Sequence, residues 1–193
     1  MTLQKRALGQ SGIIVSCLGL GTVKFGRNQE VKYPRSFSLP SDDMILNLLN
    51  QAEVLGINFL DTAPAYGSSE QRLGRLLKRR QDWVICTKVG EEFVTGKSFF
   101  DFSGPHIRNS IERSLRNLKT DYLDLVLVHS DGNDIGIIDS TDCLETLTIL
   151  KKAGLIRAIG MSTKSVEGGI KAAELTDAVM VTYNPNNTAG AEV

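Results

Sequence analysis

The stretch GINFLDTAPAYGSSEQRLGRLLKRRQDWVICTK, residues 56–88, decides the fold. Its apolar runs at residues 57–60 and 84–87 have the near-continuous hydrophobicity of strands that are covered on both faces. Between these runs, residues 69–78 place three leucines on one face of a helix. A strand, a helix and a second strand in this order predict two parallel strands joined by a crossover helix.

The same alternation continues in both directions along the chain. The six strand candidates are residues 15–20, 57–60, 84–87, 125–128, 156–161 and 178–183. The helix candidates are residues 41–55 with Ser41 as the cap, 69–78, 105–118, 141–153 and 165–175. Because no linker interrupts this pattern, we predict a single domain over residues 1–193.

Two α/β architectures fit alternating strands and helices, namely an open doubly wound sheet and a closed (β/α)₈ barrel of the TIM type. A doubly wound sheet that binds a dinucleotide shows GxGxxG after its first strand. Here the first strand runs into LGLGTVKFG, residues 18–26, whose glycines have a different spacing. The barrel is therefore favoured, and the open sheet remains the alternative.

Composition excludes several classes of partner. Lys plus Arg equals Asp plus Glu at 22 each, so no net charge favours binding to nucleic acid or to an anionic membrane. Three cysteines without CxxC spacing and only two histidines indicate buried thiols in a reducing compartment and no metal site. Neither a signal peptide nor a membrane span is visible, so we expect a cytoplasmic protein. The sequence leaves the oligomeric state open.

Three successive strands run directly into an ionisable residue, namely Asp61, Lys88 and His129. Tyr66 follows Asp61 by five residues in the loop TAPAYG. Each residue alone also has an ordinary structural interpretation, such as a turn cap, a solvated strand end, a core histidine or a packed loop aromatic. Because the carboxyl ends of parallel strands meet at one rim, we expect the four side chains to converge there.

These residue types suit the protonation of an oxyanion. The ammonium of Lys88 is expected to lower the pKa of Tyr66, and Asp61 is expected to keep Lys88 charged. His129 can orient an incoming carbonyl oxygen through a hydrogen bond. The sequence offers no obvious nucleophile and no carboxylate pair, so proton donation coupled to hydride delivery from a bound cofactor is the favoured reaction.

Five segments, in this order along the chain, resemble the aldo-keto reductase superfamily. They are LGLGT (18–22), GINFLDTAPAYGSSEQRLGRLL (56–77), VICTKVG (84–90), IERSLRNLKTDYLDLVLVHS (111–130) and GLIRAIGMSTKS (154–165). Residues 3–16 resemble the hairpin that closes the bottom of the family's barrel, which places the start of the first barrel strand near Val15. The resemblance implies a (β/α)₈ barrel that uses NADPH to reduce small aldehydes and ketones to alcohols.

The resemblance also implies a role for each matching residue. Tyr66 is expected to be the general acid, Asp61 and Lys88 the pair that tunes it, and His129 the group that orients the substrate. The expected cofactor-binding residues are Gly21, Thr22, Asp61, Ser162, Thr163 and Met180. The last three align with a Ser-Asn pair and a Gln in the family, so two of the three differ, and a thioether is a weak acceptor and no donor.

The length implies a carboxyl-terminally truncated reductase, with about six βα units and without the last two, which in the family bind the pyrophosphate and adenine phosphate. Two alternatives are a noncatalytic binding or regulatory module and an inactive remnant of a reductase. Retention of all four polar residues favours the enzyme. Substrate choice is expected to depend on the loops at residues 24–40 and 91–103, and the phenylalanines of the second loop can line a pocket or pack the loop onto the barrel.

Overall fold

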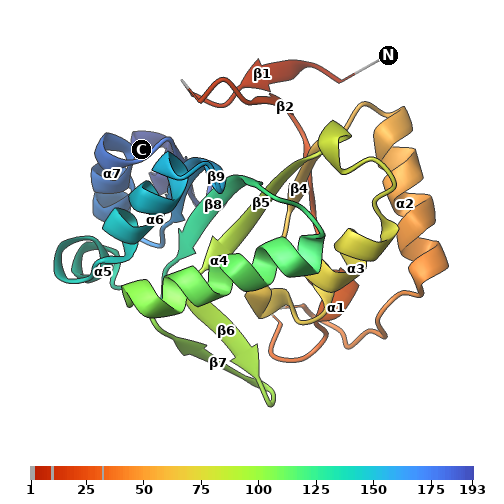
Figure 1. Ribbon diagram of the computed structural model, residues 1–193, viewed down its shortest axis with the longest axis horizontal. Helices are drawn as coiled ribbons and strands as arrows, with labels where there is room; N and C mark the ends of the chain where they lie inside the picture. The colour runs from red at the N-terminus through yellow and green to blue at the C-terminus, as the bar shows by residue number, and fades with distance from the viewer. Residues whose placement is uncertain (1–2, 10, 32) are drawn as a thin grey trace.

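The computed structural model describes residues 3–9, 11–31 and 33–193 (Figure 1). At its centre is a parallel sheet of six strands that are neighbours in space in the order in which they occur along the chain. The strands are β3 (Gly19–Gly21), β4 (Phe59–Asp61), β5 (Val84–Val89), β8 (Leu123–His129), β9 (Ile156–Ser162) and β10 (Ala178–Met180). A doubly wound sheet reverses its strand order, so this alternative is excluded. The sheet is an incomplete (β/α)₈ barrel.

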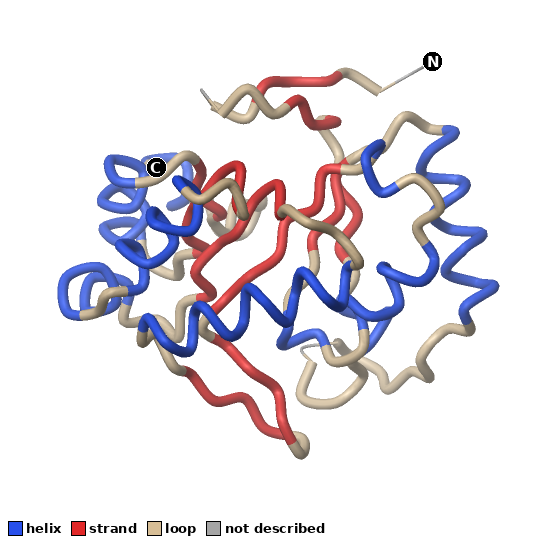
Figure 2. The backbone as a smooth tube through the Cα atoms, in the orientation of Figure 1, coloured by secondary structure: helices blue, strands red, loops and turns tan. Residues whose placement is uncertain are grey.

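The helices lie along the outer side of the curved sheet (Figure 2). The main ones are α2 (Asp42–Val54), α3 (Ser69–Leu76), α4 (Gly104–Leu118), α6 (Cys143–Lys152) and α7 (Val166–Leu175). Each of the five predicted helices is confirmed, and Ser41 caps α2 by accepting a hydrogen bond from the backbone N–H of Met44. The short helices α1 (Val23–Gly26) and α5 (Asp134–Ser140) were not predicted. No helix in the described ranges is long and apolar enough to cross a membrane.

Five apolar residues repeat with helical period along α2, but not all of them are buried. Ile45, Leu49 and Ala52 are buried, whereas Leu48 and Leu55 are 40% and 55% exposed. A helix at the end of the row has a neighbouring helix on only one flank, so the outermost positions of its apolar stripe have nothing to pack against.

The alternation of side chains along the strands divides the core into two parts. Outward-facing residues such as Leu60, Ile85 and Val126 pack against the helices. Inward-facing residues such as Cys86 and Leu127 fill the lumen. Since the strands are parallel and alternate with a period of two, the last inward-facing residue of each strand lies at the carboxyl-terminal rim.

The expected hairpin is present and closes the opposite end of the lumen (Figure 1). Strand β1 (Lys5–Ala7) pairs antiparallel with β2 (Ile14–Ser16), and Ile13 and Val15 pack into the lumen, while residue 10 lies outside the described residues.

The predicted start of the first barrel strand near Val15 is wrong, because this strand begins at Gly19. Asn58 explains the interruption: its side chain accepts a hydrogen bond from the Ser16 N–H and donates one to the Ile14 carbonyl. The Ser16 hydroxyl donates to the Leu18 carbonyl, so the chain turns between the hairpin and the barrel strand.

Residues 91–103, expected to form a loop, contain a second hairpin that projects from the rim (Figure 1). Its strands are β6 (Glu91–Val94) and β7 (Lys97–Phe100). Thr95 and Gly96, which join them, have φ angles of 50° and 81°, as a two-residue type I′ turn requires. Phe99 and Phe100 are partly exposed at 46% and 38%.

Candidate active site

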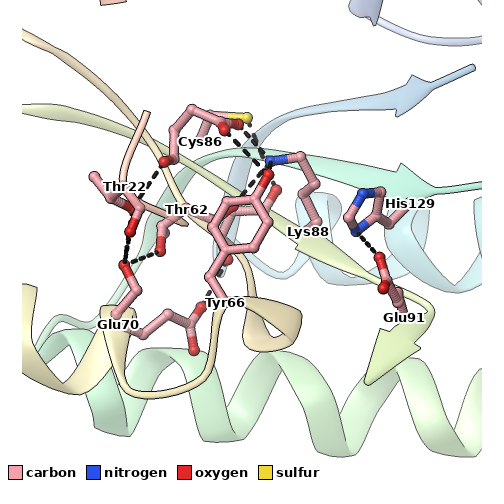
Figure 3. A network of polar contacts seen from close by, with 11 residues as sticks. Thr22, Thr62, Tyr66, Glu70, Cys86, Lys88, Glu91 and His129 are labelled. Atoms are coloured by element: carbon pink, nitrogen blue, oxygen red, sulfur yellow. Dashed lines mark hydrogen bonds and ion pairs between the residues drawn. The ribbon is translucent and has the colours of Figure 1, made fainter. Parts of the chain in front are cut away.

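The carboxyl ends of three neighbouring strands bring Asp61, Lys88 and His129 to one rim. Lys88 is only 2% exposed and forms an ion pair with Asp61 (Figure 3). Its ammonium also donates hydrogen bonds to the Thr62 carbonyl at 3.0 Å and to the Tyr66 hydroxyl at 3.2 Å. The buried charge is therefore surrounded by three oxygen acceptors, one of which carries a negative charge.

Tyr66 ends the short 3₁₀ helix η1 (Pro64–Tyr66), and its hydroxyl points toward the ammonium of Lys88 (Figure 3). Its hydroxyl donates to Asp61 Oδ2 at 3.4 Å, and its ring centroid lies 6.3 Å from that of His129, edge to face. The four residues that the sequence predicted to converge thus lie together.

The electrostatics of the pair Tyr66 and Lys88 differ in part from expectation. Burial raises the pKa of Tyr66, and the nearby charge of Lys88 lowers it by less, so the net shift is upward. The expected net lowering is therefore wrong, because loss of solvent outweighs the ammonium. Burial alone lowers the pKa of Lys88, but the charge of Asp61 raises it above its ordinary value. At neutral pH, Tyr66 is protonated and Lys88 is charged.

A buried chain of hydroxyl groups holds the backbone at Asp61. Thr22 donates from Oγ1 to the Asp61 carbonyl at 2.8 Å and accepts from Ser69 Oγ at 2.8 Å. Thr62 Oγ1 donates to Ser69 Oγ at 3.0 Å. Thr22 and Ser69 are fully buried, so the hydroxyl of Thr22, expected at the cofactor, instead contacts protein groups that position Asp61. Ser69 lies in the motif TAPAYGSSE, but nothing in its spacing distinguished it from a helix cap.

The lumen opens into a cavity of about 530 Å³ that reaches both edges of the sheet. Gly21, Asp61 and Met180 line it at the rim, and the hairpin contributes its floor. A Cβ atom on Gly21 would meet no other atom within 4 Å, so open space lies above this residue. Ser162 pairs in register with both His129 and Met180 and therefore belongs to the same rim.

Thr163, like Thr22, is separated from the candidates that face the lumen. It follows the inward-facing Ser162, and its Oγ1 lies 3.3 Å from where a Cβ would stand on Gly169 of α7. This hydroxyl is buried and has no hydrogen-bond partner among the described residues. Its side chain therefore faces the helix layer, whereas the other strand-end candidates face the lumen.

Glu91, which no pattern in the sequence marked as a site residue, lies beside His129. Glu91 Oε2 is 2.9 Å from His129 Nδ1, and Oε1 accepts a hydrogen bond from Ser98 Oγ at 2.6 Å and lies 3.5 Å from Arg27. Burial opposes ionisation of Glu91, but His129, Ser98 and Arg27 together lower its pKa to about 2. The signal that could have located Glu91 is the Thr95-Gly96 turn, which predicts a hairpin beginning directly after β5. No group of His, Cys, Asp or Glu suited to a metal ion occurs in the described part of the chain.

Comparison with known proteins gives a consistent result. The Aldo/keto reductase family matches residues 17–189. L-galactose dehydrogenase of Arabidopsis thaliana is 34% identical over 168 residues, covering 83% of this chain and 48% of that protein. D-arabinose 1-dehydrogenase of Saccharomyces cerevisiae is 37% identical over 131 residues, covering 65% of this chain and 37% of that protein. The chain thus spans about half or less of the length of these relatives.

Solved structures agree. The crystal structure of PA4992 from Pseudomonas aeruginosa superimposes with a TM-score of 0.92 at 53% identity, covering 98% of this chain and 73% of that one. The holo form of the aldo-keto reductase AKR11C1 from Bacillus halodurans gives a TM-score of 0.77 at 32% identity, covering 94% of this chain and 58% of that one.

Proposed function

The chain belongs to the aldo/keto reductase family, and from this premise we propose that its site reduces small aldehydes and ketones to alcohols with NADPH, with Tyr66 as the general acid. One observation carries the proposal. The buried ammonium of Lys88 lies within hydrogen-bond distance of both Asp61 and the Tyr66 hydroxyl. An acid that must leave a phenolate behind needs such a charge beside it.

Each residue has a defined part in the proposed reaction. Bound NADPH supplies the hydride to the carbonyl carbon. Tyr66 donates its proton to the carbonyl oxygen as that oxygen gains negative charge, and Lys88 stabilises the resulting phenolate. Asp61 keeps Lys88 charged despite burial, and His129 orients the carbonyl oxygen.

The lumen suits the nicotinamide half of the cofactor. The cavity offers space above Gly21, and the hydroxyl of Ser162 stands at the same rim. Among the proposed cofactor-binding residues, Met180 fits the nicotinamide least well, because its thioether cannot donate a hydrogen bond to the carboxamide. We also propose that residues 1–193 act as one domain in the cytoplasm. Three free cysteines support this compartment: Cys86 and Cys143 are buried as expected, whereas Cys17 is exposed, so the expectation of a buried thiol is wrong there.

The names of two relatives suggest a substrate class. One is an L-galactose dehydrogenase and the other a D-arabinose 1-dehydrogenase. Sugars and their lactones, as well as simple aldehydes, therefore belong in the first substrate panel, measured in both directions because the proposed hydride transfer is reversible.

The test replaces Tyr66 by Phe and measures NADPH oxidation across that panel. We expect kcat/KM to fall by about 10²–10⁴ because the proton donor is lost. Tyr122→Phe is the matched control, since Tyr122 immediately precedes β8, at the opposite end of the barrel, and packs against Arg80 and Arg157. Undiminished activity in Tyr66→Phe contradicts the assigned role. Saturable NADPH binding without turnover of any substrate supports a binding module instead, and an aggregate without binding supports an inactive remnant.

A further inference from the structure

His129 has a partner on the side of its ring that carries Nδ1. The carboxylate of Glu91, the first residue of β6, lies 2.9 Å from this nitrogen. Nδ1 is buried and makes no aligned hydrogen bond among the described residues. In ligand-free sites, catalytic hydrogen bonds are commonly misaligned and tighten only when substrate binds. In the ligand-free structure, His129 Nδ1 and the Glu91 carboxylate are therefore at hydrogen-bond distance, but the hydrogen bond is not yet aligned.

The chemistry of the pair restricts the protonation state of His129. A carboxylate can only accept hydrogen bonds, so an attractive contact requires a proton on Nδ1. A neutral ring with its proton on Nδ1 has a bare Nε2, which can accept a hydrogen bond but cannot donate one to a carbonyl oxygen. Only the doubly protonated ring contacts Glu91 and also donates from Nε2.

The surroundings keep Glu91 ionised. Ser98 donates a hydrogen bond to Oε1, and Arg27, 9% exposed, lies 3.5 Å from the same oxygen. Arg27 is itself fixed, because it stacks on the ring of Phe93 at 3.7 Å and donates to the Ala65 carbonyl. Glu91 therefore presents a permanent negative charge at the rim.

Arg27 shares the charge of Glu91 with His129, and the other ionisable groups near the ring are neutral or already paired. Tyr66 faces the ring from η1 and is protonated, and the charge of Lys88 is matched by Asp61. Arg27 approaches Glu91 through Oε1, whereas His129 faces Oε2. Each carboxylate oxygen thus has its own cationic or cation-forming partner.

We propose that Glu91 is a positioning residue that holds His129 in the doubly protonated form, so that Nε2–H is offered to the substrate's carbonyl oxygen. This inference rests on the proposed function, because the contact with Glu91 requires a proton on Nδ1 alone and donation to the substrate requires the second proton on Nε2. The projecting hairpin β6–β7 then has a role in the site, because it carries Glu91, whose negative charge pairs with His129 on β8.

The protonation of His129 can be measured without any reaction. Long-range ¹H–¹⁵N correlation spectra of the ¹⁵N-labelled chain at neutral pH report which ring nitrogens carry protons. With only two histidines in the sequence, the signals are assigned by comparison with His106→Gln. We expect both nitrogens of His129 to be protonated in the unmodified chain and one of them to lose its proton in Glu91→Gln.

Glu92→Gln is the matched control, because Glu92 is the next residue of β6 but contacts Arg113 and His106 instead of His129. It should alter the signals of His106 and leave those of His129 unchanged. A neutral His129 in the unmodified chain, or identical His129 spectra with and without Glu91, overturns the proposal.

Kinetics provide a second readout. In Glu91→Gln, kcat/KM for carbonyl reduction should fall by about tenfold, as is common when the partner that orients a functional histidine is removed, and the alkaline limb of the pH profile should move to lower pH. Glu92→Gln should change neither. If no carbonyl substrate is reduced at all, the proposed function fails while the spectra still decide the role of Glu91; an unchanged pH profile in an active Glu91→Gln enzyme counts against that role.

Discussion

Lys88 shows how much of the site depends on a single buried charge. Removing an ammonium from water costs several kcal/mol, and the cost is met only where oxygen atoms surround the charge closely. Asp61, Thr62 and Tyr66 supply those atoms, and two of them are candidate catalytic groups. The contacts that make burial of Lys88 possible are therefore the contacts that the proposed chemistry uses.

This arrangement gives a prediction for Lys88→Met. The substitution leaves Asp61 unpaired, and because the Asp61 side chain is 22% exposed, we expect the free energy of unfolding to fall by about 2–3 kcal/mol, somewhat below the cost of breaking a fully buried pair. The double variant Asp61→Asn/Lys88→Met should be more stable than Lys88→Met alone, because it leaves no uncompensated charge. Urea denaturation measures the free energy of unfolding of Asp61→Asn, Lys88→Met and the double variant. If the losses from Asp61→Asn and Lys88→Met simply add, the two residues are not energetically coupled.

At the scale of elements, Tyr66 is positioned by a contact between the short helices α1 and η1. The 3₁₀ turn that carries Tyr66 lies so close to α1 that a Cβ on Gly26 would stand 2.3 Å from the Tyr66 carbonyl and 2.3 Å from the Ser69 amide nitrogen. Both obstacles are backbone atoms, which cannot rotate away as a flexible side chain can. Gly67, directly after Tyr66, has a φ of 62°, which further fixes the path of the turn.

Gly26→Ala should therefore displace Tyr66 while leaving the rest of the sheet intact. We expect a loss of stability of about 1–3 kcal/mol from the steric conflict and a fall of about 10²-fold in carbonyl reduction, because displacement by about 1 Å at a reacting group has this effect. Gly154→Ala is the control: its Cβ meets nothing within 4 Å, so only backbone strain at a φ of 82° is added. Melting temperature and rate are measured on the same samples. Full activity in Gly26→Ala contradicts the positioning role.

Some elements could be predicted from the sequence and others could not. Parallel strands and their crossover helices were predictable because burial on both faces and a helical period leave strong patterns over many residues. The first strand was placed too early because its interruption depends on Asn58, which is distant in sequence. Hairpin β6–β7 was not predicted because its phenylalanines contribute little to the core. Glu91 was not predicted as a site residue because it is the first residue of this hairpin.

At the scale of the whole molecule, the sequential order of parallel strands explains why the site could be predicted. Each strand contributes its last inward-facing residue to one rim, and Gly21, Asp61, Lys88, His129, Ser162 and Met180 are those residues. Thr22 and Thr163 lie beyond the strand ends, where the alternation of side chains along a strand no longer determines which way a side chain points. They face the protein interior and the helix layer, and no pattern in the sequence could have shown this.

The same geometry allows the nicotinamide site to be tested through Met180. This residue faces the lumen cavity beside Ser162, at the position where the family commonly has a Gln. Met180→Gln supplies an amide that can both donate to and accept from the nicotinamide carboxamide. One added neutral hydrogen bond contributes about 1 kcal/mol, so we expect the Kd for NADPH to fall about fivefold in a fluorescence titration.

Reduced nicotinamide mononucleotide, which lacks the adenylate half, should show the same gain, because the added contact is made to the ring that both ligands share. Met44→Gln is the control, since Met44 lies on the outer face of α2 and is 62% exposed; its Kd should not change. An equal Kd in Met180→Gln and the unmodified chain means that the carboxamide does not approach β10. The nicotinamide would then be held at the rim by the other candidates, such as Gly21 and Ser162, and the proposed place of residue 180 in the cofactor site would fail.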